Sequence, residues 1–110
     1  MIHNTARFTV RPEHADDWPE IARAFTEATR AEPGCLWFHW SRDVDDPCQY
    51  LLLGAFREDA AADHVGSAHF QEAQRTLPAY LQQTPTILGV VVEDREWVEL
   101  GEMRVPAEAT

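Results

Sequence analysis

His64 and His69 are the residues whose type and spacing best suit proton-transfer chemistry. Imidazole titrates close to neutral pH, which makes histidine the commonest general base in enzymes. Gly66 and Ser67 lie between them, and we expect the glycine to end one short helix at positive φ and the serine to cap the next helix. His69 would then lie in the first turn of that helix, where the dipole favours the neutral imidazole, so it is the preferred base. The alternative role of His64 is structural, as a helix-end side chain bonded to a nearby carbonyl or carboxylate.

Six further side chains are candidates for binding a flat, small aromatic substrate, because aromatic and aliphatic walls line most small-molecule pockets. The candidates are Asn4, Tyr50, Leu52, Phe56, Phe70 and Tyr80. Asn4 is the polar residue on an otherwise apolar strand face, so its amide is a candidate donor to a substrate carbonyl. The alternatives are that the aromatic residues belong to the core or a dimer seam, and that Asn4 marks an exposed strand end.

The order of secondary-structure elements predicts an α+β fold. Apolar alternation indicates strands over 2–11, 35–43, 50–56 and 86–93, and helical periodicity indicates helices from about 17 to 32, over 60–65 and after Ser67, the last interrupted at Pro78. This βαββαβ order is the ferredoxin-like arrangement with a four-stranded antiparallel sheet. We expect one domain over 2–100, with a short strand-like extension near 96–100, and a frayed tail over 101–110.

The two central strands are apolar on both faces, which predicts a homodimer. In 35–43 the side chains alternate between Phe38 with Trp40 and Trp37 with His39, and 50–56 is apolar throughout. An antiparallel sheet in a small monomer usually has one face in water, and the helices can cover only one face. A second copy of the same sheet is the economical cover for the other face.

Composition excludes several classes of partner. Nineteen acidic and nine basic residues give a formal net charge of −10, which repels nucleic-acid phosphates and anionic membrane surfaces. No window approaches the roughly 20 apolar residues of a membrane span, and no signal-peptide pattern is seen, so a cytoplasmic location is expected.

Cys35 and Cys48 would lie at opposite ends of a hairpin, too far apart for a disulfide.

The spacing of potential ligands does not predict a metal or cofactor site. The five glycines form neither a dinucleotide-binding nor a phosphate-binding loop. The five histidines include no i,i+4 pair, and Gly66 interrupts the i,i+5 pair, so no protein-held metal is expected from local spacing.

Several short motifs, in order and spacing, resemble the antibiotic biosynthesis monooxygenase domain over about residues 2–93. They are Glu32-Pro33-Gly34-Cys35, the turn from Asp43 to Pro47, Phe56-Arg57-Glu58-Asp59, and Ala62-Asp63-His64 followed by Ser67-Ala68-His69-Phe70. The resemblance implies a dimeric α+β barrel of two face-to-face sheets. It also places His64 and His69 at two histidine positions of the quinol-monooxygenase-like members, with Phe70 at the neighbouring hydrophobic position.

This chain departs from the family pattern at Gly54, where many members have glutamate. The resemblance then implies a larger pocket and the loss of a possible partner for His64. Haem degradation is disfavoured, because Gln74 occupies the position of the axial histidine and Ala6 that of a strand-one asparagine in the haem-degrading relatives. We therefore expect a cofactor-independent monooxygenase that oxidises a phenolic, quinol or polyketide-like substrate with O₂ as co-substrate. The alternatives are a non-catalytic ligand-binding or stress-related protein and a cofactor-free isomerase.

Overall fold

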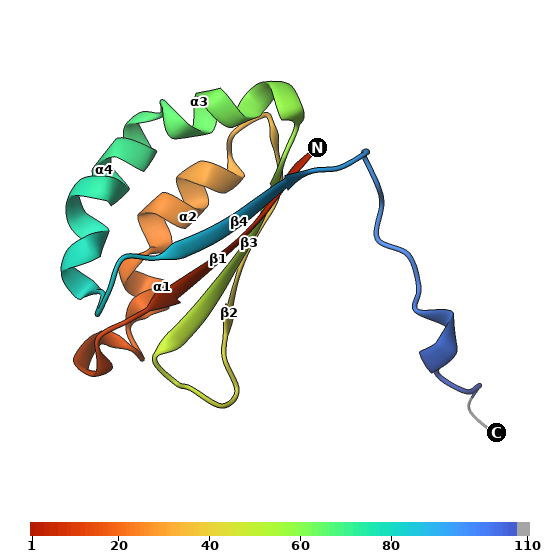
Figure 1. Cartoon of the computed structure of the whole chain (residues 1–110), viewed down its shortest axis with the longest axis horizontal. Helices are drawn as coiled ribbons and strands as arrows, with labels where there is room; N and C mark the ends of the chain where they lie inside the picture. The colour runs from red at the N-terminus through yellow and green to blue at the C-terminus, as the bar shows by residue number, and fades with distance from the viewer. Residues whose placement is uncertain (108–110) are drawn as a thin grey trace.

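The computed structural model describes residues 1–107, which form a four-stranded antiparallel sheet with helices against one face (Figure 1). The strands are β1 (Ile2–Thr9), β2 (Cys35–Arg42), β3 (Gln49–Phe56) and β4 (Thr86–Val91), in the order β2-β3-β1-β4. The α-helices are α1 (Trp18–Ile21), α2 (Arg23–Arg30), α3 (Ala61–Val65) and α4 (Ala68–Thr76), and the 3₁₀ turns are η1 (Pro12–His14), η2 (Glu58–Ala60), η3 (Leu77–Tyr80) and η4 (Gly101–Met103). The predicted ferredoxin-like α+β arrangement is confirmed.

The structure corrects two details of the predicted helices. The first helix is divided at Ala22, whose φ of −89° and ψ of 1° leave the α region, so it forms α1 and α2. Gly66 ends α3 at a φ of −84° and not in the left-handed region. Ser67 caps α4 as predicted, because its Oγ accepts a hydrogen bond from the Phe70 amide at 3.2 Å.

The helix-covered face of the sheet carries the core. Alternation along β1 and β3 places Ala6 opposite Leu52 and Asn4 opposite Gly54 on this face. At the end of the sheet near the β2–β3 hairpin, the fully buried Trp18 packs beside Tyr50, whose hydroxyl donates a hydrogen bond to the Ala15 carbonyl at 2.7 Å. Burial raises the pKa of Tyr50. The core is therefore tightly filled at that end, and the open space lies elsewhere along the same face.

The opposite face of the sheet has no helix over it in the described part of the chain (Figure 1). On β4, Leu88 is 76% exposed and Val90 is 52% exposed, and both belong to this outer face because they pair with Thr5 and His3 of β1. The β3 residue Leu53 is half-buried on the same face, where it pairs with Thr5 from the other side. The sheet thus carries apolar side chains on both faces, and the outer face is uncovered in the single chain.

Beyond β4 the chain runs away from the sheet as an extended arm (Figure 1). It contains exposed apolar side chains, including Trp97 at 77% exposure. The centroid of the Trp97 ring lies 5.5 Å from that of Trp37 on the outer face. The expected extension near 96–100 is not a strand, and the tail predicted over 101–110 contains the η4 turn, with residues 108–110 outside the described part. None of the helices described is long and apolar enough to cross a membrane.

Candidate functional site

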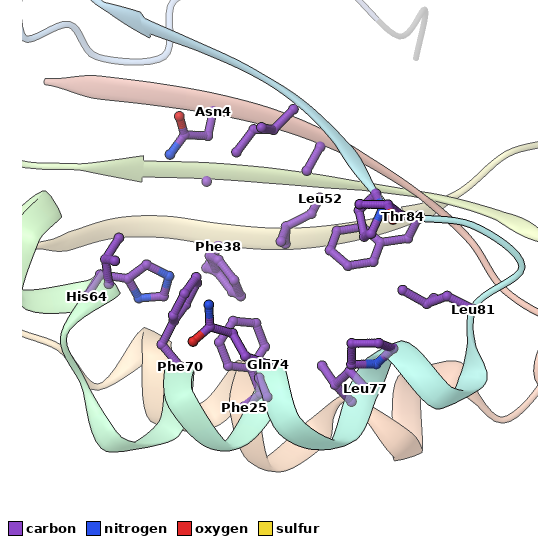
Figure 2. Close-up of a pocket in the computed structure, with 18 of the residues that line it drawn as sticks. Asn4, Phe25, Phe38, Leu52, His64, Phe70, Gln74, Leu77, Leu81 and Thr84 are labelled. Atoms are coloured by element: carbon purple, nitrogen blue, oxygen red, sulfur yellow. The ribbon is translucent and has the colours of Figure 1, made fainter.

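A cavity of about 640 Å³ lies between the helix-covered face of the sheet and α4 (Figure 2). Its walls come from the strands on one side and from α2, α3, α4, η3 and the segment after η3 on the other. Most of its lining is apolar, with Phe25, Phe38, Leu52, Phe56, Phe70, Leu77 and Ile87 among the larger side chains. The polar side chains are Asn4, His64, Gln74 and Thr84. A volume of this size, with few polar groups, suits a small organic ligand.

His64 lies at one end of this cavity, beside Phe38 and Phe70 (Figure 2). Its ring centroid lies 4.7 Å from that of Phe56 and 5.0 Å from that of Phe70. The residue is 9% exposed. His64 is therefore enclosed by aromatic rings, and a ligand in the cavity would meet its imidazole in a water-poor environment.

Glu32 holds His64 from the side away from the cavity. One carboxylate oxygen, Oε2, lies 2.7 Å from Nδ1 of His64 and 2.6 Å from Nε2 of His69. The Glu32 side chain is only 13% exposed, and the two imidazoles are 11% and 24% exposed respectively. Three groups distant in sequence thus form one hydrogen-bonded unit, which connects the end of α2 to α3 and α4.

This arrangement determines which nitrogen of His64 carries hydrogen. An ionised carboxylate only accepts hydrogen bonds, so Nδ1 of His64 and Nε2 of His69 must both donate to Glu32. In the neutral form of His64 the other nitrogen, Nε2, then has a free lone pair, and no described residue forms a hydrogen bond with it. His64 is consequently oriented as a proton acceptor.

A close turn after α2 places Glu32 against α3, where it contacts His64. Pro33 and Gly34 follow it, and a Cβ on Gly34 would lie 2.0 Å from the Cβ of Ala60, so only glycine permits this approach. The Gly34 carbonyl also accepts a hydrogen bond from the Arg57 amide at 2.8 Å. The packing of the Glu32-Pro33-Gly34 segment against η2 therefore positions the carboxylate.

Asn4 places an amide in the cavity from β1 (Figure 2). Its neighbour on β4 is Gly89, where a Cβ would lie 2.7 Å from the Asn4 Oδ1. The absence of a side chain at position 89 therefore gives the amide its room. No hydrogen bond to the Asn4 side chain is formed by the described residues, so the amide is available to a ligand.

Gly54 also lines the cavity, as its relation to the family pattern implied. A Cβ at this position would lie 3.2 Å from Phe38 and 3.5 Å from Phe56, so any side chain would enter the space between these rings. The expected loss of a partner for His64 is offset by Glu32, which supplies the carboxylate from a different element.

The structure brings only part of the predicted site together. His64, Asn4, Leu52, Phe56 and Phe70 line the cavity.

The other three predicted site residues lie outside the lining. His69 bonds Glu32, and Tyr50 is committed to the core and to its backbone hydrogen bond. Tyr80 packs edge-on against His14, with ring centroids 4.9 Å apart. The preference for His69 as the base is therefore revised in favour of His64, because His64 is the histidine in contact with the cavity.

Glu32 is the important residue that sequence reasoning missed. In the sequence it marks the end of the first expected helix and belongs to the Glu32-Pro33-Gly34-Cys35 motif, and it lies 32 residues before His64 and 37 before His69. The available signal was a carboxylate immediately before a Pro-Gly turn. Local spacing could not connect it to the histidines, because the contact depends on the packing of the turn against η2.

Comparison with known proteins gives a consistent picture. The model of the family described as "Antibiotic biosynthesis monooxygenase" matches residues 1–76. A crystal structure described as an antibiotic biosynthesis monooxygenase is 26% identical, with a TM-score of 0.74, over 86% of this chain and all of that one. The Pseudomonas aeruginosa protein PA3566 is 29% identical, with a TM-score of 0.72, over 84% of this chain and 94% of that one.

A Synechocystis protein, the uncharacterized sll1783, is 25% identical over 85 residues. The match covers 76% of this chain and 53% of the relative, so the chain spans about half the length of that protein.

Proposed function

From the chain's membership of the antibiotic biosynthesis monooxygenase family, shown by the match over residues 1–76, we propose that it is a cofactor-independent monooxygenase acting on a phenolic, quinol or polyketide-like aromatic substrate. The family and the cavity support a monooxygenase-like or small-molecule-binding function. The observation that carries the finer proposal is His64, a buried imidazole with its Nδ1 bonded to Glu32 and its Nε2 available to the cavity.

In the proposed reaction, Nε2 of His64 removes the hydroxyl proton of the substrate. Glu32 stabilises the imidazolium that results, since its carboxylate already accepts the Nδ1 hydrogen at 2.7 Å. Asn4 donates a hydrogen bond to a substrate oxygen. His69 is a positioning residue, because it bonds the same carboxylate oxygen and does not line the cavity.

The substrate itself supplies the electrons. Its electron-rich anion transfers two electrons to O₂ to form a carbon-bound hydroperoxide. Loss of water from this hydroperoxide, as the C–H bond at the same carbon breaks, takes two more electrons from the substrate. One oxygen atom thus stays in the product as a carbonyl, and the other leaves as water. The aromatic lining excludes water around the anion and holds it in one orientation. No resident metal or organic cofactor is needed for this chemistry, so cofactor-free turnover by metal-stripped protein is expected.

The decisive experiment is oxygen uptake by metal-stripped protein with a panel of hydroquinones and anthrols. We expect uptake above the autoxidation blank, a loss of about 10² to 10⁴-fold in the His64→Ala variant, and wild-type uptake in the control His14→Ala, since His14 packs against Tyr80 outside the cavity. Uptake that is no faster than the blank contradicts the oxygenase. Ligand binding alone would then indicate a binding protein, and turnover under nitrogen an isomerase.

We also propose that the chain functions as a homodimer that covers the outer face of the sheet. The support is the exposed apolar surface of β4, where Leu88 is 76% exposed, together with the half-buried apolar residues of β3. Light scattering at micromolar concentration tests this. Leu88→Arg should shift the mass toward the monomer, whereas the control Val44→Arg, in a turn at 96% exposure, should not. A monomeric wild-type chain would contradict the dimer.

A further inference from the structure

The unit formed by Glu32, His64 and His69 has the donor set of a metal site as well as that of a hydrogen-bonded network. One ligand atom from each residue lies within 4.8 Å of the other two. Two imidazoles and one carboxylate are a common ligand set for Zn²⁺ and other divalent first-row metals. We propose that these three residues bind one divalent transition-metal ion, for which Zn²⁺ is the probe, and that this ion inhibits the proposed reaction instead of supporting it.

The geometry requires only a small adjustment. At bond lengths of about 2.0–2.2 Å, tetrahedral ligands of Zn²⁺ lie roughly 3.3–3.5 Å apart. The Glu32 oxygen lies 2.7 Å from His64 Nδ1 and 2.6 Å from His69 Nε2. The three side chains come from the turn after α2, from α3 and from α4. Their rotation can open these two contacts by several tenths of an ångström and bring the two imidazole nitrogens, which lie within 4.8 Å of each other, to the same spacing. Each imidazole stays neutral when its ring hydrogen moves to the other nitrogen, so both can become ligands.

The environment also suits a cation. The three side chains are 11–24% exposed, with His69 the most accessible, which leaves room for a water molecule as the fourth ligand on the solvent side. The carboxylate neutralises part of the ion's charge. The formal net charge of −10 raises the local concentration of cations around the molecule.

The proposed ion would lie behind His64 as seen from the cavity, because Glu32 and His69 do not line the cavity whereas His64 does. Coordination through Nδ1 places the hydrogen of the neutral imidazole on Nε2. That nitrogen would then donate a hydrogen bond to a ligand and no longer accept a proton. Metal binding and the general-base role of His64 are therefore mutually exclusive, and this inhibitory consequence rests on the proposed function.

Metal binding itself is tested without any substrate. Calorimetric titration of the metal-free chain with Zn²⁺ should show one ion per chain, and Glu32→Gln and His69→Ala should each weaken binding by more than about tenfold. His14→Ala is the control, because His14 is remote from the cluster and packs against Tyr80. Equal weak binding by all four proteins, as expected for scattered surface carboxylates, would overturn the site.

A second measurement does not depend on the variants folding. In the wild-type chain, one equivalent of Zn²⁺ should shift the ¹⁵N resonances of His64 Nδ1 and His69 Nε2, and leave those of His14 unchanged. Unshifted ring nitrogens overturn the site. The inhibitory role is tested separately, by the loss of oxygen uptake on addition of one equivalent of Zn²⁺. If no substrate is turned over at all, the proposed function fails while the two binding measurements still decide the metal site.

Discussion

Replacement of Glu32 by glutamine tests the central contact of the site with almost no change in shape. The wild-type carboxylate oxygen accepts two hydrogen bonds, at 2.7 Å from His64 and 2.6 Å from His69. An amide has one acceptor oxygen and one donor nitrogen. Both histidines bond the same oxygen, Oε2, so the amide presents either its oxygen or its nitrogen to both of them. In the first case both hydrogen bonds lose their charged acceptor, and in the second both histidines must change tautomer or lose their bonds.

The expected cost in stability follows from the charge of the carboxylate. Hydrogen bonds to charged groups contribute about 1.5–3 kcal/mol each, and neutral ones about 0.5–1.5 kcal/mol. With the Glu32 side chain 13% exposed, solvent screens these contacts only weakly. We expect Glu32→Gln to lower the free energy of unfolding by about 1–3 kcal/mol, measured by urea denaturation. The control Glu27→Gln, one turn earlier on α2 with a side chain 65% exposed, should change it by less than about 0.5 kcal/mol.

The effect on activity should exceed the effect on binding. Glu32 does not line the cavity, so the Kd of an aromatic ligand should stay within about threefold of wild type. The kcat for oxygen uptake should fall by about 10- to 100-fold, because the imidazolium of His64 loses its charged partner. The ring ¹⁵N resonances of His64 report which atom the amide presents, because its tautomer is kept if the oxygen replaces Oε2 and is reversed if the nitrogen does. An unchanged unfolding free energy together with an unchanged kcat would refute the role of Glu32.

Three further predictions concern the scaffold. Gly34→Ala should cost about 2 kcal/mol or more in thermal or urea unfolding, because the new Cβ would lie 2.0 Å from that of Ala60, whereas Gly101→Ala, with nothing within 4 Å, should be neutral. Tyr50→Phe should cost about 1 kcal/mol by removing a buried hydrogen bond of 2.7 Å. The pKa of Tyr50 is raised in the folded state, so its neutral form contributes stability that is fully present below the pKa of the unfolded chain. This contribution is lost as the pH rises through the pKa of the folded chain. The wild-type chain should therefore lose more stability above about pH 10 than the phenylalanine variant. Burial raises the pKa of Cys35, so its alkylation by iodoacetamide near pH 7 should be slower than that of free cysteine, and labelling at the rate of free cysteine would contradict its partial burial.

The fold could be predicted because its determinants are local and periodic. The apolar patterns over 2–11, 35–43 and 50–56 predicted the three strands observed as β1, β2 and β3, since side chains of a strand point to opposite sides. The Ser67 cap marked the start of α4. The division of the first helix at Ala22 was missed, because its helical periodicity continues across the break and only the local backbone changes direction.

The candidate site was less predictable from the sequence, for reasons that particular residues illustrate. His64 was identified by its residue type, but its role was placed second to that of His69, since nothing local shows which imidazole meets a cavity. Tyr50 and Leu52 share one strand face, yet only Leu52 lines the cavity, because packing around Trp18 fills the space beside Tyr50.

The sequence by itself determined the element order, the two-sided sheet and the identity of the groups able to move a proton. These properties follow from residue type and from periods of two and 3.6 residues, which are set by backbone geometry alone. Only the tertiary structure decided that Glu32 joins His64 and His69, because that contact depends on a turn whose glycine packs against Ala60, far along the chain. The residue type of His64 therefore determines which chemistry it can perform. The packing of the distant Glu32-Pro33-Gly34 turn determines which of its ring nitrogens accepts the proton.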